Sequence, residues 1–134
     1  MRASSDTGDY VEIERAEPRE VSGDLLLLVR VKRHKFSGEI DAWVEQRAWF
    51  GFAQDLTILE QTRQGEARLE GISPGELSLV FHSLDRAGHV GVEGTIGRRS
   101  FDGEIALRFS VFAFDPSQLV VLAREARALS KAAG

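Results

Sequence analysis

Apolar and polar residues alternate with a period of two along several stretches of the chain. This is the pattern of strands that bury one face. It covers residues 10–14, 24–33, 39–49, 66–70 and 76–83. The stretch 24–33 is aliphatic on both faces until it becomes basic. The pattern therefore predicts a chain rich in short strands.

The period changes after residue 50. Phe52, Leu56 and Leu59 are four and three positions apart, which places them on one stripe of a helix. We expect this helix over residues 51–64. Gly65 stands where a C-terminal cap is expected, because glycine adopts the left-handed conformation that ends many helices.

The segment 76–97 indicates its own strand pairing. An antiparallel register with Leu84 opposite His89 sorts apolar from polar residues on both strands at once. A shift by one residue would mix them. The cross-strand pairs of this register are Phe81–Val92 and Leu77–Ile96 on the apolar side and Ser78–Thr95 on the polar side.

A second hairpin follows, with Asp102-Gly103 as its turn signal. It leads into a strand over residues 104–114. One face of that strand is aliphatic or aromatic and carries Ile105, Leu107, Phe109 and Val111. Phe112 and Phe114 fall on the other face, so we expect the end of this strand to be covered on both sides.

The last twenty residues predict a second helix. Asp115 is a suitable N-cap, and Pro116 occupies the first helical position. The expected apolar stripe consists of Leu119, Leu122, Ala126 and Leu129.

These elements predict an α+β fold. Its sheet is expected to be mainly antiparallel and curved, with six or seven strands, one helix between strands and one at the C-terminus. The alternative is a β-sandwich with helical additions. Residues 1–8 are small and polar, and we expect a disordered tail there. Residues 9–134 show no sequence repeat and no linker, which indicates a single globular domain.

Composition narrows the class of protein. The chain has 134 residues, 43% of them hydrophobic, and a formal net charge of −4. That charge is unfavourable for a polyanionic partner, so no nucleic-acid role is expected. The absence of cysteine excludes disulfides and thiolate chemistry. The first residues lack the apolar stretch of a secretory signal, and no run is long enough to cross a membrane. We therefore expect a cytoplasmic protein.

One basic run, RVKRHK at residues 30–35, stands out against the acidic balance. On a strand, Arg30 and Lys32 fall on one face while Val31 and Arg33 fall on the other. The positive charge is thus divided between two faces and a turn instead of forming one stripe. A charged strand end also discourages edge-to-edge aggregation. We interpret the run as a solvated strand end.

No nucleophile elbow, phosphate-binding loop or dinucleotide fingerprint is present, so no catalytic residue and no cofactor are predicted. The histidines give one alternative. In the register above, His82 and His89 share the polar face as diagonal neighbours, with Glu93 farther along the same face of the strand, four residues beyond His89. A metal site formed by His82, His89 and Glu93 is conceivable, although the spacing matches no known ligand signature.

The two tryptophans give a different candidate. On a strand over 39–49, Trp43 and Trp49 lie on the face opposite Ile40, Ala42 and Val44. Either another layer covers them, or they form an exposed aromatic anchor, or two copies bury them in a homodimer. Aromatic anchors dominate many protein interfaces. As an anchor, Trp43 and Trp49 together with acidic Asp41 and Glu45 would form a partner-binding surface.

Several short motifs occur in a familiar order. These are DAWV at 41–44 before an amphipathic helix, GELSLVF at 75–81, the glycine-rich strand 91–97, and FDPSQL at 114–119. In this order the chain resembles the small WapI-type immunity proteins of bacteria, and related small bacterial domains, over roughly residues 24–130. The resemblance implies direct binding to a toxin domain, which the immunity protein blocks, and it implies no catalytic residue.

Two function hypotheses follow. The first is a non-enzymatic, cytoplasmic protein-binding domain, of an immunity-like kind. The second is a small enzyme or ligand- or metal-binding protein that uses a pocket on the sheet around His82, His89 and Glu93.

Overall fold

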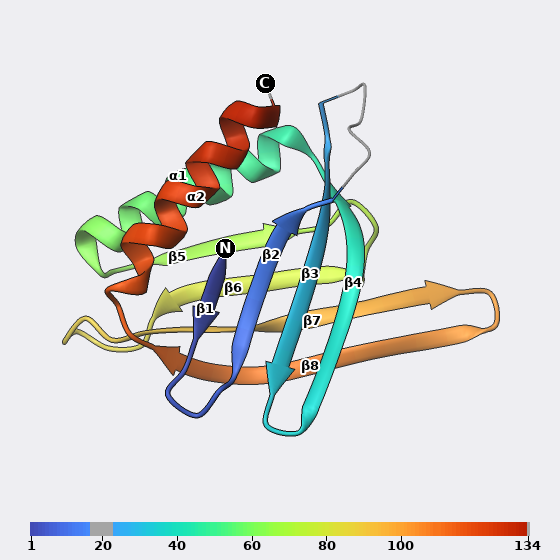
Figure 1. The fold of residues 1–134 in the computed structure, drawn as a ribbon, viewed down its shortest axis with the longest axis horizontal. Helices are drawn as coiled ribbons and strands as arrows, with labels where there is room; N and C mark the ends of the chain where they lie inside the picture. Colours follow the sequence, from blue (N-terminus) through green and yellow to red (C-terminus); the bar gives the residue numbers. More distant parts are fainter. Residues whose placement is uncertain (17–22, 134) are drawn as a thin grey trace.

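Four strands followed by a helix occur twice in succession in the computed structural model, which describes residues 1–16 and 23–133 (Figure 1). The first unit contains β1 (Arg2–Ser4), β2 (Tyr10–Arg15), β3 (Leu25–Arg33), β4 (Phe36–Val44) and α1 (Gln46–Thr62). The second unit contains β5 (Glu66–Glu70), β6 (Leu77–Ser83), β7 (Val90–Ser100), β8 (Gly103–Phe114) and α2 (Gln118–Ala133). The repetition is one of secondary structure, which the residue pattern did not reveal.

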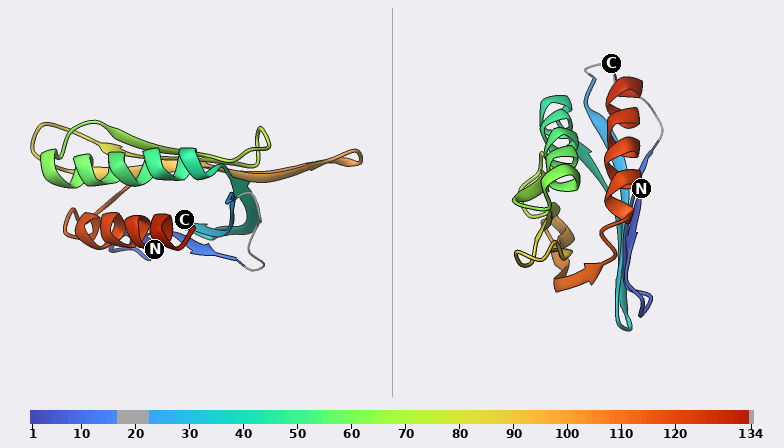
Figure 2. Two further views of the ribbon diagram at one scale, coloured as in Figure 1. Left: turned by 90° about the horizontal axis from the view of Figure 1, so that it is seen from above. Right: turned by 90° about the vertical axis from the view of Figure 1, so that its left-hand side faces the viewer.

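The α+β class with antiparallel strands is confirmed, but the single curved sheet of six or seven strands is wrong. The described strands form two four-stranded sheets, β1-β2-β3-β4 and β5-β6-β7-β8. The sheets lie in two layers, as the turned views show (Figure 2). With the alternative, a β-sandwich with helical additions, the fold shares the presence of two sheets instead of one. The alternation of apolar and polar residues locates the strands. It does not reveal that β4 and β5 belong to different sheets.

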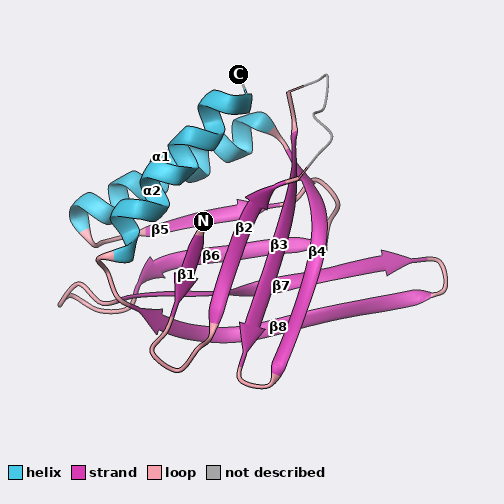
Figure 3. Ribbon diagram, viewed as in Figure 1, coloured by secondary structure: helices cyan, strands magenta, loops and turns pink. Residues whose placement is uncertain are grey.

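The two helices pack against each other on one side of the molecule (Figure 3). Helix α1 runs beside β5, and α2 runs beside β1. Helix α1 of the first unit therefore covers the first strand of the second unit, and helix α2 of the second unit covers the first strand of the first unit. The contact between α2 and β1 includes a pair of hydrogen bonds. Ser4 N donates to Gln118 Oε1, and Gln118 Nε2 donates to Ser4 O, both at 2.9 Å.

The expected disordered tail at residues 1–8 is wrong, because Arg2–Ser4 form β1 and pair with β2. Ala3 is fully buried. The N-terminal ammonium of Met1 donates to Ile13 O at 3.0 Å. Small residues are what this position requires, since β1 fits between β2 and α2. A stretch of three residues gives too little alternation to be recognised as a strand.

Helix α1 begins at Gln46, five residues before the predicted start, and β4 ends at Val44. Trp49 therefore belongs to the helix and not to the strand. The buried stripe contains the predicted Phe52, Leu56 and Leu59. The helix ends at Thr62, where Arg63 adopts a left-handed conformation and donates its N–H to Leu59 O at 2.8 Å.

The predicted register of the first hairpin in the second unit is confirmed. In the ladder of β6 and β7, Phe81 faces Val92, Leu77 faces Ile96, and Ser78 faces Thr95. Leu84 N donates to His89 O at 2.8 Å, which closes the hairpin at the expected residues. Sorting apolar from polar residues was sufficient here because one face of this hairpin is buried and the other is not.

The hairpin of β7 and β8 is confirmed, but the faces assigned to the end of β8 are wrong. The pairing shifts by one residue between Val92 and Gly94. Because of this bulge, Phe112 and Phe114 point into the core on the same side as Phe109, and Val111 is 36% exposed. One extra residue reverses which side chains point inward, and the alternation alone did not show it.

The second helix is also confirmed. Leu119, Leu122 and Ala126 are buried, and Leu129 is partly buried. Asp115 Oδ1 accepts a 2.9 Å hydrogen bond from Ser117 N just before the helix. Neither described helix is both long enough and apolar enough to span a membrane.

Candidate functional site

The structure separates the residues that were predicted to form a partner-binding surface. Trp49 is fully buried on α1, and its Nε1 donates to Ala126 O on α2 at 3.0 Å. Its ring lies 5.3 Å from that of Phe52. Trp49 therefore joins the two helices in the core, and its assignment as a partner anchor is wrong. A homodimer that buries Trp43 against Trp49 is excluded for the same reason.

The other three predicted residues remain at the surface. Trp43 is half-buried on β4, and its carbonyl accepts a 2.9 Å hydrogen bond from Ile72 N. Asp41 is exposed and accepts from Arg98 Nη2 at 2.5 Å. Glu45 is exposed just before α1. Asp41, Trp43 and Glu45 lie close together along the chain. The aromatic residue among them, Trp43, is only partly exposed.

A different surface combines exposed apolar side chains with a hollow. A cleft of about 670 Å³ lies between the β3–β4 hairpin of the first sheet and the β7–β8 hairpin of the second. Phe36 and Ile105 line it and are 74% and 80% exposed. Ile40, Ile96 and Leu107 also line it. Large aliphatic and aromatic side chains exposed around one hollow are typical of a docking surface.

The fold explains why this cleft exists. The β7–β8 hairpin is longer than the hairpins of the first sheet, and it extends past them (Figure 1). The inward side of β8 therefore loses the layer that would cover it, and Ile105 is left exposed. At Gly38 the opposite wall has no side chain. A Cβ there would lie 3.2 Å from Ile96 Cδ1, so the two hairpins approach closely at the base of the cleft.

Arginine side chains surround the apolar lining. Arg33 Nη1 donates to the buried Asp9 at 2.6 Å, and Arg98 pairs with Asp41 at 2.5 Å. Arg108 also lines the cleft and has no ion-pair partner among the described residues. The cleft therefore offers apolar contact in its centre and, at its rim, one arginine, Arg108, that no described carboxylate neutralises. A partner that presents an apolar side chain beside a carboxylate would complement both.

Sequence reasoning located Ile105 on the inward face of its strand but did not identify it, or Phe36, as a site residue. The sequence did not show that the β7–β8 hairpin is longer than the β3–β4 hairpin, and this difference in length is what exposes both side chains. The end of the β7–β8 hairpin extends well past β4 (Figure 1). From the sequence alone, an inward-facing Ile105 reads as an ordinary core residue.

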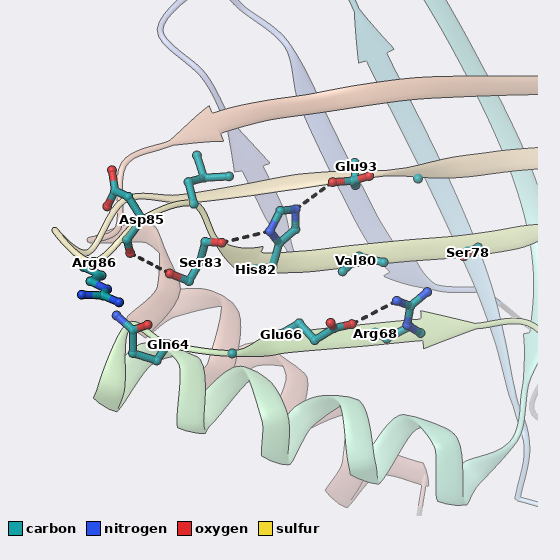
Figure 4. Close-up of a pocket in the computed structure, with 13 residues that line it drawn as sticks. Gln64, Glu66, Arg68, Ser78, Val80, His82, Ser83, Asp85, Arg86 and Glu93 are labelled. Atoms are coloured by element: carbon teal, nitrogen blue, oxygen red, sulfur yellow. Dashed lines mark hydrogen bonds and ion pairs between the residues drawn. The ribbon is translucent and has the colours of Figure 1, made fainter.

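The second hollow is a polar groove of about 700 Å³ on the outer face of β5, β6 and β7 (Figure 4). His82 and Glu93, two of the three residues in the predicted metal site, meet there. His82 Nε2 lies 2.8 Å from Glu93 Oε2, and His82 Nδ1 lies 3.0 Å from Ser83 O. Both ring nitrogens therefore face oxygen atoms of the chain, which leaves neither of them free for a metal ion.

The third member of the predicted metal site lies elsewhere. His89 Nδ1 is 2.7 Å from Asp85 Oδ2 in the turn between β6 and β7. The hydrogen bond with His89 is the main reason that the pKa of Asp85 is lowered. The described residues contain no group of three or more His, Asp or Glu side chains arranged to hold a metal ion. The structure therefore does not bring His82, His89 and Glu93 together as a metal site.

The rest of the groove is occupied by ion pairs within the chain. Arg68 pairs with Glu66 at 3.0 Å (Figure 4), and it also contacts Glu70, outside the groove, at 3.6 Å. These side chains are about half exposed and solvated. The groove thus has charged walls that largely neutralise each other, and its one exposed large apolar side chain among the described residues is Leu84, at 39%.

Comparisons with protein-family models, with curated proteins and with solved structures find no match to this chain.

Proposed function

We propose that this protein is a non-enzymatic binding domain that holds an apolar segment of a partner protein in the cleft between the β3–β4 and β7–β8 hairpins. The observation that carries the proposal is the exposure of Phe36 and Ile105 on the two sides of one hollow. Burying either side chain against a partner removes a large apolar area from water, which is the main source of affinity at an interface.

The charges favour a particular chemistry in the partner. Arg98 lines the cleft but is paired with Asp41, whereas Arg108 projects from the outer face of β8 at the rim, so an acidic residue next to the apolar anchor would gain its contact mainly with Arg108. The chain as a whole is acidic, with a net charge of −4. Three arginines and one glutamate, Glu39, line the cleft, so its lining is more basic than the chain as a whole, although Arg33 and Arg98 are paired with carboxylates.

A narrower form of the proposal is an immunity-like protein that acts in the cytoplasm and neutralises a bacterial toxin domain by direct binding. The resemblance of the motifs at 41–44, 75–81 and 114–119 to WapI-type immunity proteins supports this form. The competing hypothesis, an enzyme or metal-binding protein built on His82, His89 and Glu93, has less support because His89 pairs with Asp85 instead.

A peptide selection tests the cleft without a known partner. Peptides of about twelve residues, displayed on phage, would be selected on the wild-type protein and titrated by calorimetry against variants. We expect the selected peptides to combine an aromatic or aliphatic residue with Asp or Glu. Phe36→Ser and Ile105→Ser should each weaken their binding about tenfold or more, because each removes most of one apolar wall.

The matched control is Ile58→Ser. Ile58 is 46% exposed on α1 and does not line the cleft. This substitution removes a similar exposed side chain and should leave peptide binding unchanged. If Ile58→Ser weakens binding as much as the cleft variants do, or if the cleft variants bind like the wild type, the cleft is not the binding site. Circular dichroism of each variant would establish that it is folded.

A further inference from the structure

The outer edge of β8 differs from the other sheet edges of the described chain. Gln118 bonds to the backbone of Ser4 at the β1 edge, and α1 runs beside β5. At the β4 edge, the carbonyl of Trp43 accepts from Ile72 N, and that of Asp41 accepts from Arg98 Nη2. No described strand, helix or side chain covers the β8 edge in the same way at residues 104–108.

The ladder shows which backbone groups of β8 point outward. Gly97 N donates to Glu76 O at 2.9 Å, so it points away from β8. Gly97 faces Ala106, and this pair is therefore one that exchanges no hydrogen bonds. The N–H and C=O of Ala106 must point to the free edge. Because the pattern alternates, the same holds for Glu104 and Arg108.

The exposed edge has the features that favour pairing with another strand. It is part of a 12-residue strand that contains no proline and no lysine. Residues 103–106 are exposed, and Ile105 is 80% exposed. At this end the hairpin extends past the first sheet, so a second strand can approach without meeting that layer (Figure 1). Natural proteins usually protect such edges, because an open ladder is a template for another chain.

We propose that two copies of this chain pair through their β8 edges, antiparallel, about a two-fold axis at Ala106. The two sheets β5-β6-β7-β8 would then form one continuous eight-stranded sheet. In this register Glu104 of each copy lies opposite Arg108 of the other on the outer face. Ile105 of each copy lies opposite Leu107 of the other on the inner face, which covers part of the exposed apolar area.

The charges favour a second copy of the chain as the partner. Among two-fold registers centred on the three outward-bonding residues, a centre at Glu104 places two carboxylates opposite each other. A centre at Arg108 places two guanidinium groups opposite each other. Only the centre at Ala106 pairs opposite charges, and symmetry forms that pair twice. Arg108 has no ion-pair partner within the described chain, whereas Glu104 has only a 3.4 Å contact with the exposed Arg99.

The dimer and the proposed cleft share Ile105 and Leu107, which line the cleft. The dimer is held by the backbone edge of β8, however, so a substitution that acts on this edge tests it separately. Ala106→Pro separates the two proposals. It removes an N–H that the β7–β8 ladder does not use, so the hairpin should remain folded while the dimer is lost. Peptide binding by this variant would then report on the cleft alone.

Cross-linking tests the axis directly. The chain contains no cysteine, so Ala106→Cys introduces a single thiol. Across the axis, the two Cα atoms of a hydrogen-bonded pair lie about 5.5 Å apart, within the range of a disulfide. The control is Ser110→Cys, whose two copies would lie about 27 Å apart at roughly 3.4 Å per residue. We expect a disulfide-linked dimer on mild oxidation of the first variant and none of the second. Equal cross-linking of both, or none of either, would overturn the proposal.

Charge exchange tests the register. In sedimentation equilibrium up to about 0.5 mM, the wild type should dimerise. Arg108→Glu and Glu104→Arg should each raise the dimer dissociation constant about tenfold, since each places like charges opposite each other twice. A mixture of the two variants should recover the affinity, because every facing pair is again of opposite charge. A wild type that remains monomeric throughout, or a mixture that associates no better than the single variants, would overturn the proposal.

Discussion

Asp9 and Arg33 connect the two hairpins of the first sheet through a 2.6 Å bond between Asp9 Oδ2 and Arg33 Nη1. Asp9 lies in the loop between β1 and β2 and is only 2% exposed. Its Oδ1 also accepts a 2.8 Å hydrogen bond from His34 N, in the turn where His34 adopts φ 58°. A single carboxylate thus holds a left-handed turn and neutralises a half-buried arginine.

Replacing this carboxylate should destabilise the protein. Asp9→Asn keeps the size of the side chain but leaves Arg33 without its counter-charge. Breaking a buried pair on one side costs about 2–4 kcal/mol in the free energy of unfolding, allowing for the partial exposure of Arg33. Chemical denaturation at pH 7 measures this loss. Asp6→Asn is the matched control, because Asp6 is exposed in the same loop, and it should change the stability little.

The same pair predicts how stability depends on pH. The hydrogen bond from His34 N, opposed by burial and aided by Arg33, lowers the pKa of Asp9 below its ordinary 3.8. A carboxyl whose pKa is lower in the folded state stabilises the fold above its unfolded pKa. That contribution is lost as the pH falls through the folded value. The free energy of unfolding of the wild type should therefore exceed that of Asp9→Asn by a constant amount above about pH 4, and by a smaller amount below it. A difference that stays constant down to pH 2 would contradict this assignment.

Arg30 predicts a second effect of charge. It pairs with Glu12 at 2.8 Å, with Glu39 at 2.6 Å and with Glu14 on the outer face of the first sheet. The hydrogen bond from Arg30 is the main cause of the lowered pKa of Glu12, and it opposes the effect of burial. Arg30→Gln leaves three carboxylates close together, so it should lower the stability at pH 7. The loss should diminish in acid, as these groups protonate, and in high salt.

Lys32→Gln provides the comparison, since Lys32 lies on the same strand and face without such a cluster. It should change the stability less than Arg30→Gln does. An equal loss in both variants would show that the cluster contributes nothing specific. The ion pairs of Arg30 and Arg33 also account for the basic run at residues 30–35. Arg30 and Arg33 are already engaged by carboxylates of the same chain, so the run is not a free cationic stripe.

Two glycines predict opposite responses to the same substitution. A Cβ on Gly94 would lie 2.1 Å from Ser78 O and 3.0 Å from Leu79 Cα, both backbone atoms of β6. Gly94→Ala should therefore cost about 3 kcal/mol or more, since neither strand can move aside within the ladder. A Cβ on Gly51 in α1 would meet nothing within 4 Å. Gly51→Ala should stabilise the protein by about 0.5–1 kcal/mol through higher helix propensity. Thermal denaturation of both variants tests the pair, and similar melting temperatures would contradict it.

The sequence predicts those parts of the fold in which a buried face and an exposed face alternate along neighbouring strands. The β6–β7 register was predictable because one face of that hairpin is buried, so Phe81 and Val92 had to share a side. The bulge between Val92 and Gly94 was not predictable. A one-residue shift in the pairing leaves no mark in the pattern of apolar and polar residues along β8. The candidate cleft was missed for a related reason. Whether Ile105 is covered depends on the relative lengths of hairpins in two different layers.

Trp49 shows how a local pattern can mislead. The alternation of 39–44 extends by chance to Trp49, yet the helix has already begun at Gln46. In the helical period, Trp49 falls on the same stripe as Phe52 and Leu56, which is the buried one. The shift of a few residues in one boundary thus moves Trp49 from a candidate interface into the centre of the core.

The tryptophans therefore predict different costs of truncation. Trp49 is fully buried, whereas Trp43 is half-buried on β4. Trp49→Ala should cost about 3–5 kcal/mol in the free energy of unfolding, and Trp43→Ala clearly less, because a cavity opens only at the first. Fluorescence adds an independent test. In Trp43→Phe the remaining Trp49 should be poorly quenched by acrylamide, and in Trp49→Phe the remaining Trp43 should be quenched more readily. Equal quenching, or a larger loss of stability in Trp43→Ala, would place Trp49 at the surface and restore it as a candidate anchor.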